Sequence, residues 1–126
     1  MSLNRDEIKE QYKWLTSGSK ECIVLKKKDY ESFMDDEREL SIIKVDGCDA
    51  EQILKANEHT FKNAESIIIS FKTSVEFSFL TISMFVETLT EGVDESCEVL
   101  FTSHPDEAMS DDECSVVVLV NYKEGV

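Results

Sequence analysis

Three consecutive isoleucines, Ile67 to Ile69, occupy the middle of the segment "ESIIISF" at residues 65–71. A strand with one face in water alternates apolar and polar side chains, whereas an unbroken apolar run is typical of a strand that is buried on both faces. The segment therefore predicts a central strand of an α/β sheet, and its neighbours in the sequence have to supply the rest of the fold.

Two amphipathic segments flank this strand. Upstream, a helix is expected over about 49–62, where Asp49 and Gln52 have the spacing of a capping box. Downstream, Ser78 is the expected N-cap of a second helix over 79–91. The buried stripes are expected to consist of Ala50, Ile53, Leu54 and Phe61 in the first helix, and of Ile82, Phe85, Val86, Leu89 and Val93 in the second.

Three further strands are predicted, at 40–45, 97–102 and 114–121. The last two are joined by the acidic loop "SHPDEAMSDDE" without a helix, which favours an antiparallel pair. With 66–71 as the remaining strand, the order after residue 39 is β-α-β-α-β-β. This order predicts an α/β fold, a two-layer domain in which two helices pack on one face of a mixed four-stranded sheet.

The first 39 residues are expected to precede this core with a short helix and a short strand. The helix is predicted over 4–16, where Ile8, Tyr12 and Leu15 recur at helical spacing, and the strand is "ECIVL". The segment "YESFM" then predicts one or two helical turns. Because 126 residues are typical of a single domain, we expect one domain with its α/β core over 40–122.

The charge of the chain excludes several classes of partner. There are 27 acidic and 13 basic residues, a formal net charge of −14. Proteins that bind nucleic acid or anionic lipid need a concentrated basic face, so neither is expected as a partner. No apolar run approaches the length of a membrane span, and Met1 is followed by polar residues rather than by a signal peptide. We therefore expect a cytoplasmic protein.

The sequence contains no grouping typical of a metal site or an active site. Two histidines, His59 and His104, have no neighbour that suggests a metal ligand or a general base. No nucleophile, base and oxyanion donor group together. We therefore expect no metal, no cofactor and no enzyme activity. The cysteines are far apart, none forms C-x-x-C, and they are predicted to be reduced structural thiols: Cys22, Cys48, Cys97 and Cys114.

Several segments stand in the places of motifs from one family. Three segments match these motifs in order and pattern. The segment "FSFL" at 77–80 stands at L-T-L-F-E-V-N-E-A, and "DESCEVLF" at 94–101 stands at D-P-D-A-N-I-I-F-G. The third motif, D-E-x-x-x-D-E-x-x-V-T-V-I-A-T-G, is matched by Asp106 and Glu107 followed by the run 116–120. Upstream, "NAESIIISF" is similar to G-A-x-x-V-L-V-N-I. These segments resemble the C-terminal domain of the bacterial cell-division GTPase FtsZ, a relative of tubulin. The family's turn glycines are replaced here by Thr102, Ser110 and Tyr122.

The resemblance extends to a basic triplet in "IVLKKKDYESFM". This segment stands where FtsZ carries N-x-D-F-A-D-V-x-T-V-M, the loop that one subunit inserts into the nucleotide site of its neighbour. In the family, the two aspartates help to position the water that attacks GTP. Here Lys26 stands at the first aspartate, Lys27 and Lys28 at the F-A pair, and Asp29 at the second aspartate. The resemblance implies a partner-docking loop made of these four residues. The alternative is a solvated turn whose lysines offset local acidity.

The glycine content bears on the function that the resemblance implies. FtsZ binds GTP through a glycine-rich phosphate cradle, and this chain has four glycines and no such segment. The first hypothesis is therefore a non-enzymatic, FtsZ-like interaction module without a GTP-binding domain, which docks on the nucleotide end of an FtsZ-like subunit without activating hydrolysis. The alternative is a small dimeric α/β module that kept the fold and lost the filament role, with a self-association surface outside residues 24–30.

Overall fold

A mixed four-stranded sheet forms the centre of the computed structural model, which describes residues 7–8, 15, 22–34, 39–47, 49–110 and 113–122. The strand order is β1-β4-β2-β3. The strands are β1 (Glu39–Asp46), β2 (Ala64–Thr73), β3 (Glu98–Pro105) and β4 (Cys114–Tyr122). The helices are α2 (Lys27–Phe33), α3 (Ala50–Ala56), α4 (Glu58–Lys62) and α5 (Phe79–Glu91). The predicted mixed four-stranded α/β sheet is thereby confirmed.

The neighbours of β4 differ from the prediction. The last two strands were expected to pair with each other, but β4 pairs antiparallel with β1 and β2, and β3 pairs parallel with β2. The connection from β3 to β4 passes over the end of β2, where the N–H of Asp106 donates to Thr73 O at 2.7 Å and the N–H of Ser74 donates to Glu113 O at 3.3 Å. This crossing places the apolar strand β2 inside the sheet, with both of its edges hydrogen-bonded.

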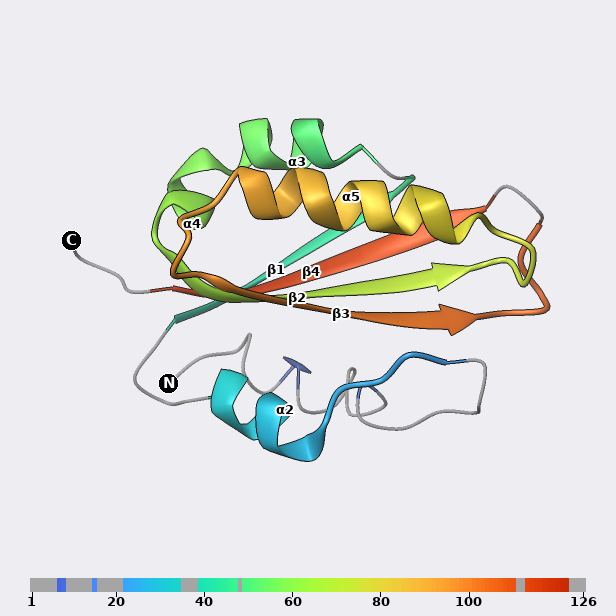
Figure 1. The fold of residues 1–126 in the computed structure, drawn as a ribbon, viewed down its shortest axis with the longest axis horizontal. Helices are drawn as coiled ribbons and strands as arrows, with labels where there is room; N and C mark the ends of the chain where they lie inside the picture. The colour runs from blue at the N-terminus through green and yellow to red at the C-terminus, as the bar shows by residue number, and fades with distance from the viewer. Residues whose placement is uncertain are drawn as a thin grey trace.

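Both predicted helical regions cover one face of the sheet, as expected (Figure 1). The first is divided into α3 and α4 at Asn57, whose side chain Nδ2 donates to Ile53 O at 2.9 Å and so competes for a helix carbonyl. The predicted cap is present, because Asp49 Oδ1 accepts a hydrogen bond from the N–H of Gln52 at 3.1 Å. Ser78 precedes α5 as predicted, although its side chain makes no capping hydrogen bond.

The core on this face is formed by the inward side chains of β2 and β4 and by the apolar stripes of the helices. Ile82, Phe85 and Leu89 of α5 are buried, and the rings of Phe71 and Phe85 meet edge to face with centroids 5.3 Å apart. The buried members of this cluster are Ala50, Ile53, Phe61, Ala64, Ile67, Ile69, Phe71, Ile82, Phe85, Leu89, Cys97, Cys114, Val116, Val118 and Val120.

The opposite face carries a second core under α2, which adds a third layer to the predicted two (Figure 1). Ile68 from β2 and Leu119 from β4 point into it, and both are 0% exposed. The buried members are Ile8, Leu15, Leu25, Phe33, Met34, Leu40, Ile68 and Leu119. The isoleucine run is therefore buried on both faces, as predicted, with Ile67 and Ile69 under the helices and Ile68 under α2.

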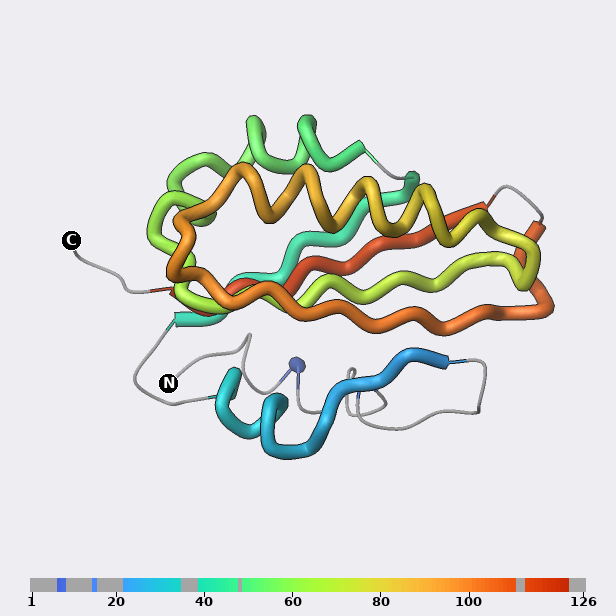
Figure 2. Tube along the Cα trace, viewed as in Figure 1, coloured from blue at the N-terminus to red at the C-terminus, as the bar shows by residue number. Residues whose placement is uncertain are grey.

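The N-terminal predictions have mixed outcomes. The strand expected at 21–25 is represented in the described residues by a single antiparallel bridge between Ile23 and Ser103 of β3, and the segment from residue 22 to α2 runs below the sheet (Figure 2). Most of the helix expected over 4–16 lies outside the described residues, as does Cys48. No helix in the described part of the chain is long and apolar enough to cross a membrane.

Candidate functional site

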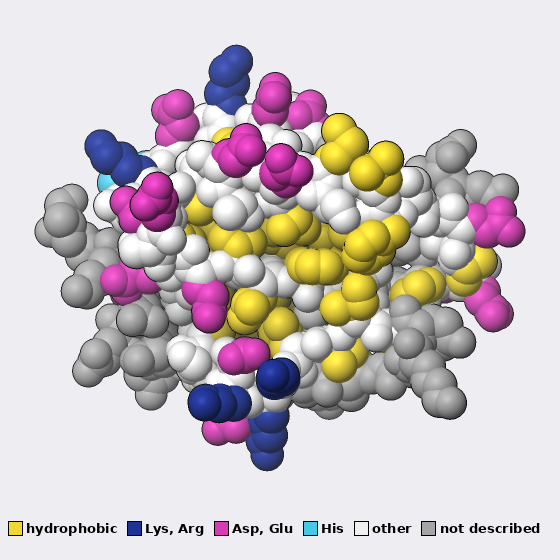
Figure 3. Space-filling model, viewed as in Figure 1, with side chains coloured by type: hydrophobic (Ala, Val, Ile, Leu, Met, Phe, Trp, Pro, Cys, Tyr) yellow, Lys and Arg dark blue, Asp and Glu magenta, His cyan; other side chains and the backbone are white. Residues whose placement is uncertain are grey.

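The basic triplet begins a helix and does not form an extended loop. Lys26 is the N-cap of α2, with φ −73° and ψ 143°, and Lys27 and Lys28 lie in the first turn. The N–H groups of Asp29 and Tyr30 donate to Lys26 O at 3.0 and 3.1 Å. These residues therefore start a helix rather than a loop, while their docking on a partner stays a prediction. All three lysine side chains are exposed, Asp29 is half-buried, and Figure 3 shows the basic side chains gathered over α2.

Contacts on both sides of the triplet fix it to the sheet. Before it, Leu25 is buried, and its N–H donates to Leu15 O at 2.8 Å. After it, Phe33 is buried, and the Nδ2 of Asn121 in β4 donates to Phe33 O at 3.0 Å. Asn121 itself is 0% exposed, so this hydrogen bond is shielded from water. The lysines therefore extend from a backbone that is held on both sides of the triplet.

The position of the lysines is electrostatically unfavourable for the helix. The first turn of a helix carries partial positive charge, so cations there cost roughly 0.3–1 kcal/mol each relative to neutral residues. Asp29 is the acidic residue in this turn. Within the described part of the chain, Lys26, Lys27 and Lys28 form no side-chain hydrogen bond or ion pair. Helix stability therefore does not account for the triplet, and the three ammonium groups are available to an external anion.

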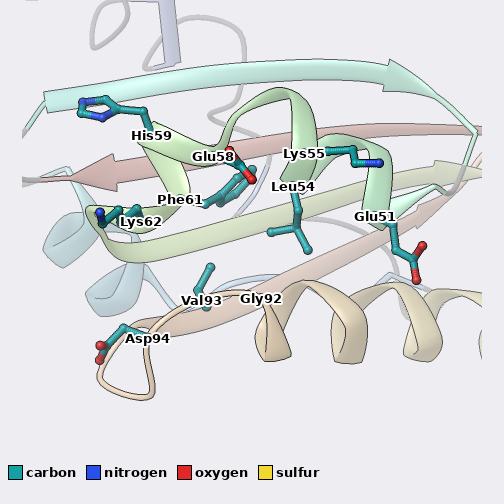
Figure 4. A pocket seen from close by; sticks show the side chains of 10 residues that line it. All are labelled: Glu51, Leu54, Lys55, Glu58, His59, Phe61, Lys62, Gly92, Val93 and Asp94. Atoms are coloured by element: carbon teal, nitrogen blue, oxygen red, sulfur yellow. The ribbon is translucent and has the colours of Figure 1, made fainter.

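A cleft of about 890 Å³ lies between the α3–α4 region and the end of α5 (Figure 4). Leu54 and Val93 line it (Figure 4), and Leu54 lies so close to Gly92 that a Cβ on Gly92 would be 2.5 Å from Leu54 Cδ1. The rim mixes acids and bases: Glu51, Glu58, Asp94, Lys55, His59 and Lys62. His59 points away from the other side chains that line the cleft (Figure 4).

The described cysteines are not joined in disulfides: Cys22, Cys97 and Cys114. Burial, with a smaller effect from Asp94, Glu98 and Glu65, raises the pKa of Cys97 to about 11, so this thiol stays protonated at neutral pH. No group of three or more His, Cys, Asp or Glu side chains within the described ranges could hold a metal ion.

Sequence reasoning missed an exposed apolar patch at the start of α5. Phe79, Leu80 and Met84 are 54%, 69% and 59% exposed, and Val75 in the preceding loop is 59% exposed. Figure 3 shows hydrophobic side chains over α5 and β3. The signal for the helical part was present in "FSFLTISMFVETL", since Phe79, Leu80 and Met84 lie outside the buried stripe and make the helix apolar on more than one face.

Comparison with known proteins identifies the fold. No family model and no curated protein sequence matches the chain. Among solved structures, it is similar to an empty FtsZ dimer from M. jannaschii, with a TM-score of 0.64 and 12% identity, covering 79% of this chain and 31% of that chain. A point mutant of FtsZ from M. jannaschii matches with a TM-score of 0.62 and 12% identity, covering 78% and 32%. The chain thus spans about a third of the FtsZ chains it matches. Its fold resembles the C-terminal domain of FtsZ.

Proposed function

We propose that this chain is a non-enzymatic protein–protein interaction module that docks through Lys26, Lys27 and Lys28 on the nucleotide end of an FtsZ-like subunit. The observation that carries the proposal is the exposed triplet on a fixed backbone, in a chain of net charge −14 with an FtsZ-like fold. Three adjacent cations on so acidic a chain suit one local anionic target, and the phosphates of a nucleotide bound to a partner are such a target.

The chemistry of lysine explains why docking would not activate hydrolysis. An ammonium group donates up to three hydrogen bonds and accepts none, so Lys26 can pair with phosphate oxygens but cannot orient an attacking water as a carboxylate would. Asp29, the second position of the family's loop, is half-buried in the first turn of α2. A bound nucleotide would therefore meet the lysines and remain unhydrolysed, and the partner's turnover would slow.

The chain is also proposed to bind no GTP of its own. A phosphate cradle needs clustered backbone N–H donors. Of the described glycines, Gly47 follows β1 with its N–H bonded to Cys114 O at 2.9 Å, and Gly92 packs against Leu54. Both have local structural roles. Calorimetric titration with GTP and magnesium tests this part directly, and micromolar binding would contradict it.

The main test measures GTP turnover by an FtsZ from the same organism with increasing amounts of this protein. The wild-type protein should slow turnover. Lys26→Ala should weaken the effect about fivefold, the equivalent of about 1 kcal/mol for one charge-assisted contact. Lys26→Asp should give a weaker blocker or a partial activator. Lys55→Ala, an exposed lysine on α3 across the sheet, is the matched control and should behave as wild type.

Salt provides a second check on this proposal. Exposed charges more than about 10 Å apart are largely screened at 0.1 M ionic strength, so the inhibition should fade as salt rises. If wild-type protein leaves turnover unchanged at tenfold excess and low salt, the triplet is a solvated turn. In that case the alternative, a dimeric α/β module, is favoured. That alternative predicts a dimer in sedimentation experiments, both for the wild type and for the Lys26→Asp variant.

A further inference from the structure

The exposed ridge of α5 changes character along its length. Leu80 and Met84 are one turn apart on the water-facing side, and Glu87 and Glu91 continue the same ridge at i+7 and i+11 from Leu80. All four side chains are exposed. The ridge therefore begins apolar and ends acidic, and Glu76 beside Val75 adds a further exposed acid at the apolar end.

The apolar half rests on a rigid support. The ring of Phe79 lies 6.4 Å from that of Phe101 in β3, which in turn lies 6.4 Å from the buried ring of Phe71 in β2. Ile82 and Phe85, on the other side of the same helix turns, are 3% exposed. The patch is therefore presented by a helix whose inner face is fixed in the core, so a ligand would meet a preformed surface.

The size of the patch limits what can cover it. If a large apolar side chain offers about 150–200 Å² when fully exposed, Val75, Phe79, Leu80 and Met84 leave on the order of 400 Å² in water. Patches of this size on a monomer are often functional. A stable dimer buries about 800 Å² per partner, so this patch alone is too small for a second copy but matches one face of a single helix.

Charge also argues against a second copy. A symmetric dimer through this ridge would place Glu87 and Glu91 against their own copies or against the apolar half of the other ridge, without a basic partner from residues 75–91, and each chain has a net charge of −14. A partner segment with Lys or Arg beside its apolar stripe would instead pair with both halves of the ridge. Met84 adds an adaptable contact, because its flexible thioether can adjust to different apolar side chains.

We infer that the Val75–Glu91 surface binds an amphipathic helix of a partner protein, with apolar residues of that helix against Phe79, Leu80 and Met84 and its basic residues against Glu87 and Glu91. This surface does not include Lys26–Lys28, so the inference stands or falls independently of the function proposed above.

The probe is a synthetic amphipathic peptide of Leu and Lys, about 18 residues or five helical turns long, carrying a fluorophore. Two further peptides serve as controls, one with Glu in place of every Lys and one with the same Leu and Lys in an order without an apolar stripe. Binding to the full chain is measured by fluorescence anisotropy at low salt. The basic amphipathic peptide should bind at least tenfold more tightly than either control, and the shifted NMR amide signals should cluster in residues 75–91.

Variants locate the site. The double variant Leu80→Ser with Met84→Ser removes side chains that are mostly exposed, so the fold should persist while affinity falls at least tenfold. Glu87→Lys with Glu91→Lys should lower affinity for the basic peptide and raise it for the acidic one. The matched control, Glu51→Lys with Glu58→Lys, makes the same two charge reversals on α3 and α4 and should change affinity less than threefold.

Three results would overturn the inference. One is equal binding of the basic peptide and its stripe-free isomer, which would show general charge attraction. Another is unchanged affinity of a folded Leu80→Ser, Met84→Ser variant, with folding checked by circular dichroism. The third is a wild-type dimer that this variant converts to monomer, since the occupant of the ridge would then be a second copy.

Discussion

The third layer under α2 leads to a quantitative prediction for Ile68→Ala. Ile68 lies on the α2 side of β2, is 0% exposed and belongs to the same buried cluster as Leu25, Phe33 and Leu119. Its counterpart Ile67, one residue earlier, is equally buried on the face under α5. Replacing each with alanine therefore compares the two cores of one strand with the same chemical change.

The magnitude follows from the lost carbon atoms and the cavity. Isoleucine to alanine removes three carbons, about 2.4 kcal/mol at about 0.8 kcal/mol per buried methylene. A cavity that relaxes only in part adds roughly 1 kcal/mol, at about 24 cal/mol per Å³. We expect Ile68→Ala to lower the free energy of unfolding by about 3–4 kcal/mol, which corresponds to a Tm lower by about 10–20 °C for a chain of this length. Ile67→Ala should give a similar loss.

The assay is equilibrium unfolding in urea, with the slope m required to match between variants so that the midpoints report stability alone. If the α2 face of the sheet were open to water, Ile68→Ala would cost about 1 kcal/mol or less, the span of strand propensity. A loss below about 1.5 kcal/mol for Ile68→Ala, beside a loss above about 3 kcal/mol for Ile67→Ala, would refute the packing of α2 over this strand.

Two further predictions concern single buried groups. Asn121→Ala should lower the free energy of unfolding by about 1–3 kcal/mol, because Phe33 O loses its hydrogen-bond donor inside the protein. The control is Asn63→Ala, which removes the same kind of hydrogen bond to His59 O at an exposed site. It should lower the free energy of unfolding by less than about 0.5 kcal/mol in the same urea assay. The pKa of Cys97 is raised from 9.0 to about 11. The contribution of this thiol to stability is therefore fully present below pH 9 and is lost as pH rises through about 11. Urea midpoints measured from about pH 8 to about 11.5 should fall over this window in the wild type and fall less steeply in Cys97→Ala. A midpoint that is flat across the window in wild type would contradict the assignment.

Features that depend on a single strand or helix could be predicted from the sequence. The unbroken run Ile67 to Ile69 predicted a strand buried on both faces, because no polar side chain was left for water. The stripe containing Ile82, Phe85 and Leu89 predicted which side of α5 faces the sheet, since helical spacing leaves little choice for its largest side chains.

The strand order and the start of α2 could not be predicted, because they depend on how several strands and helices pack together. The apolar strands β2 and β4 suit any central position, so the insertion of β4 between β1 and β2 depends on the crossing at the end of β2. The start of α2 at Lys27 opposes local electrostatics, because three lysines stand at the positive end of the helix. Burial of Leu25 and Phe33 against the sheet outweighs that cost, and no local pattern contains this information.

The exposed ridge of α5 was not predicted, although the same helix contained the signal for it. Once the stripe with Ile82, Phe85 and Leu89 is assigned to the core, apolar side chains on the opposite side of the helix are left for water. Leu80 and Met84 are these side chains, and both are exposed. An apolar excess beyond what one stripe needs is therefore a sequence signal for a surface.

The two candidate surfaces lie on opposite sides of the sheet and suit partners of opposite charge. The lysines lie over α2 and suit an anionic group, whereas the ridge of α5 combines apolar and acidic side chains and suits a cationic helix. One uniform partner surface cannot complement both, because a segment that favours one is repelled by the other. Because the sheet separates the two surfaces, occupation of one leaves the other accessible. If both proposals hold, the chain would bind an anionic target and a cationic helix at the same time, as a connecting module does, and neither surface alone would give that property.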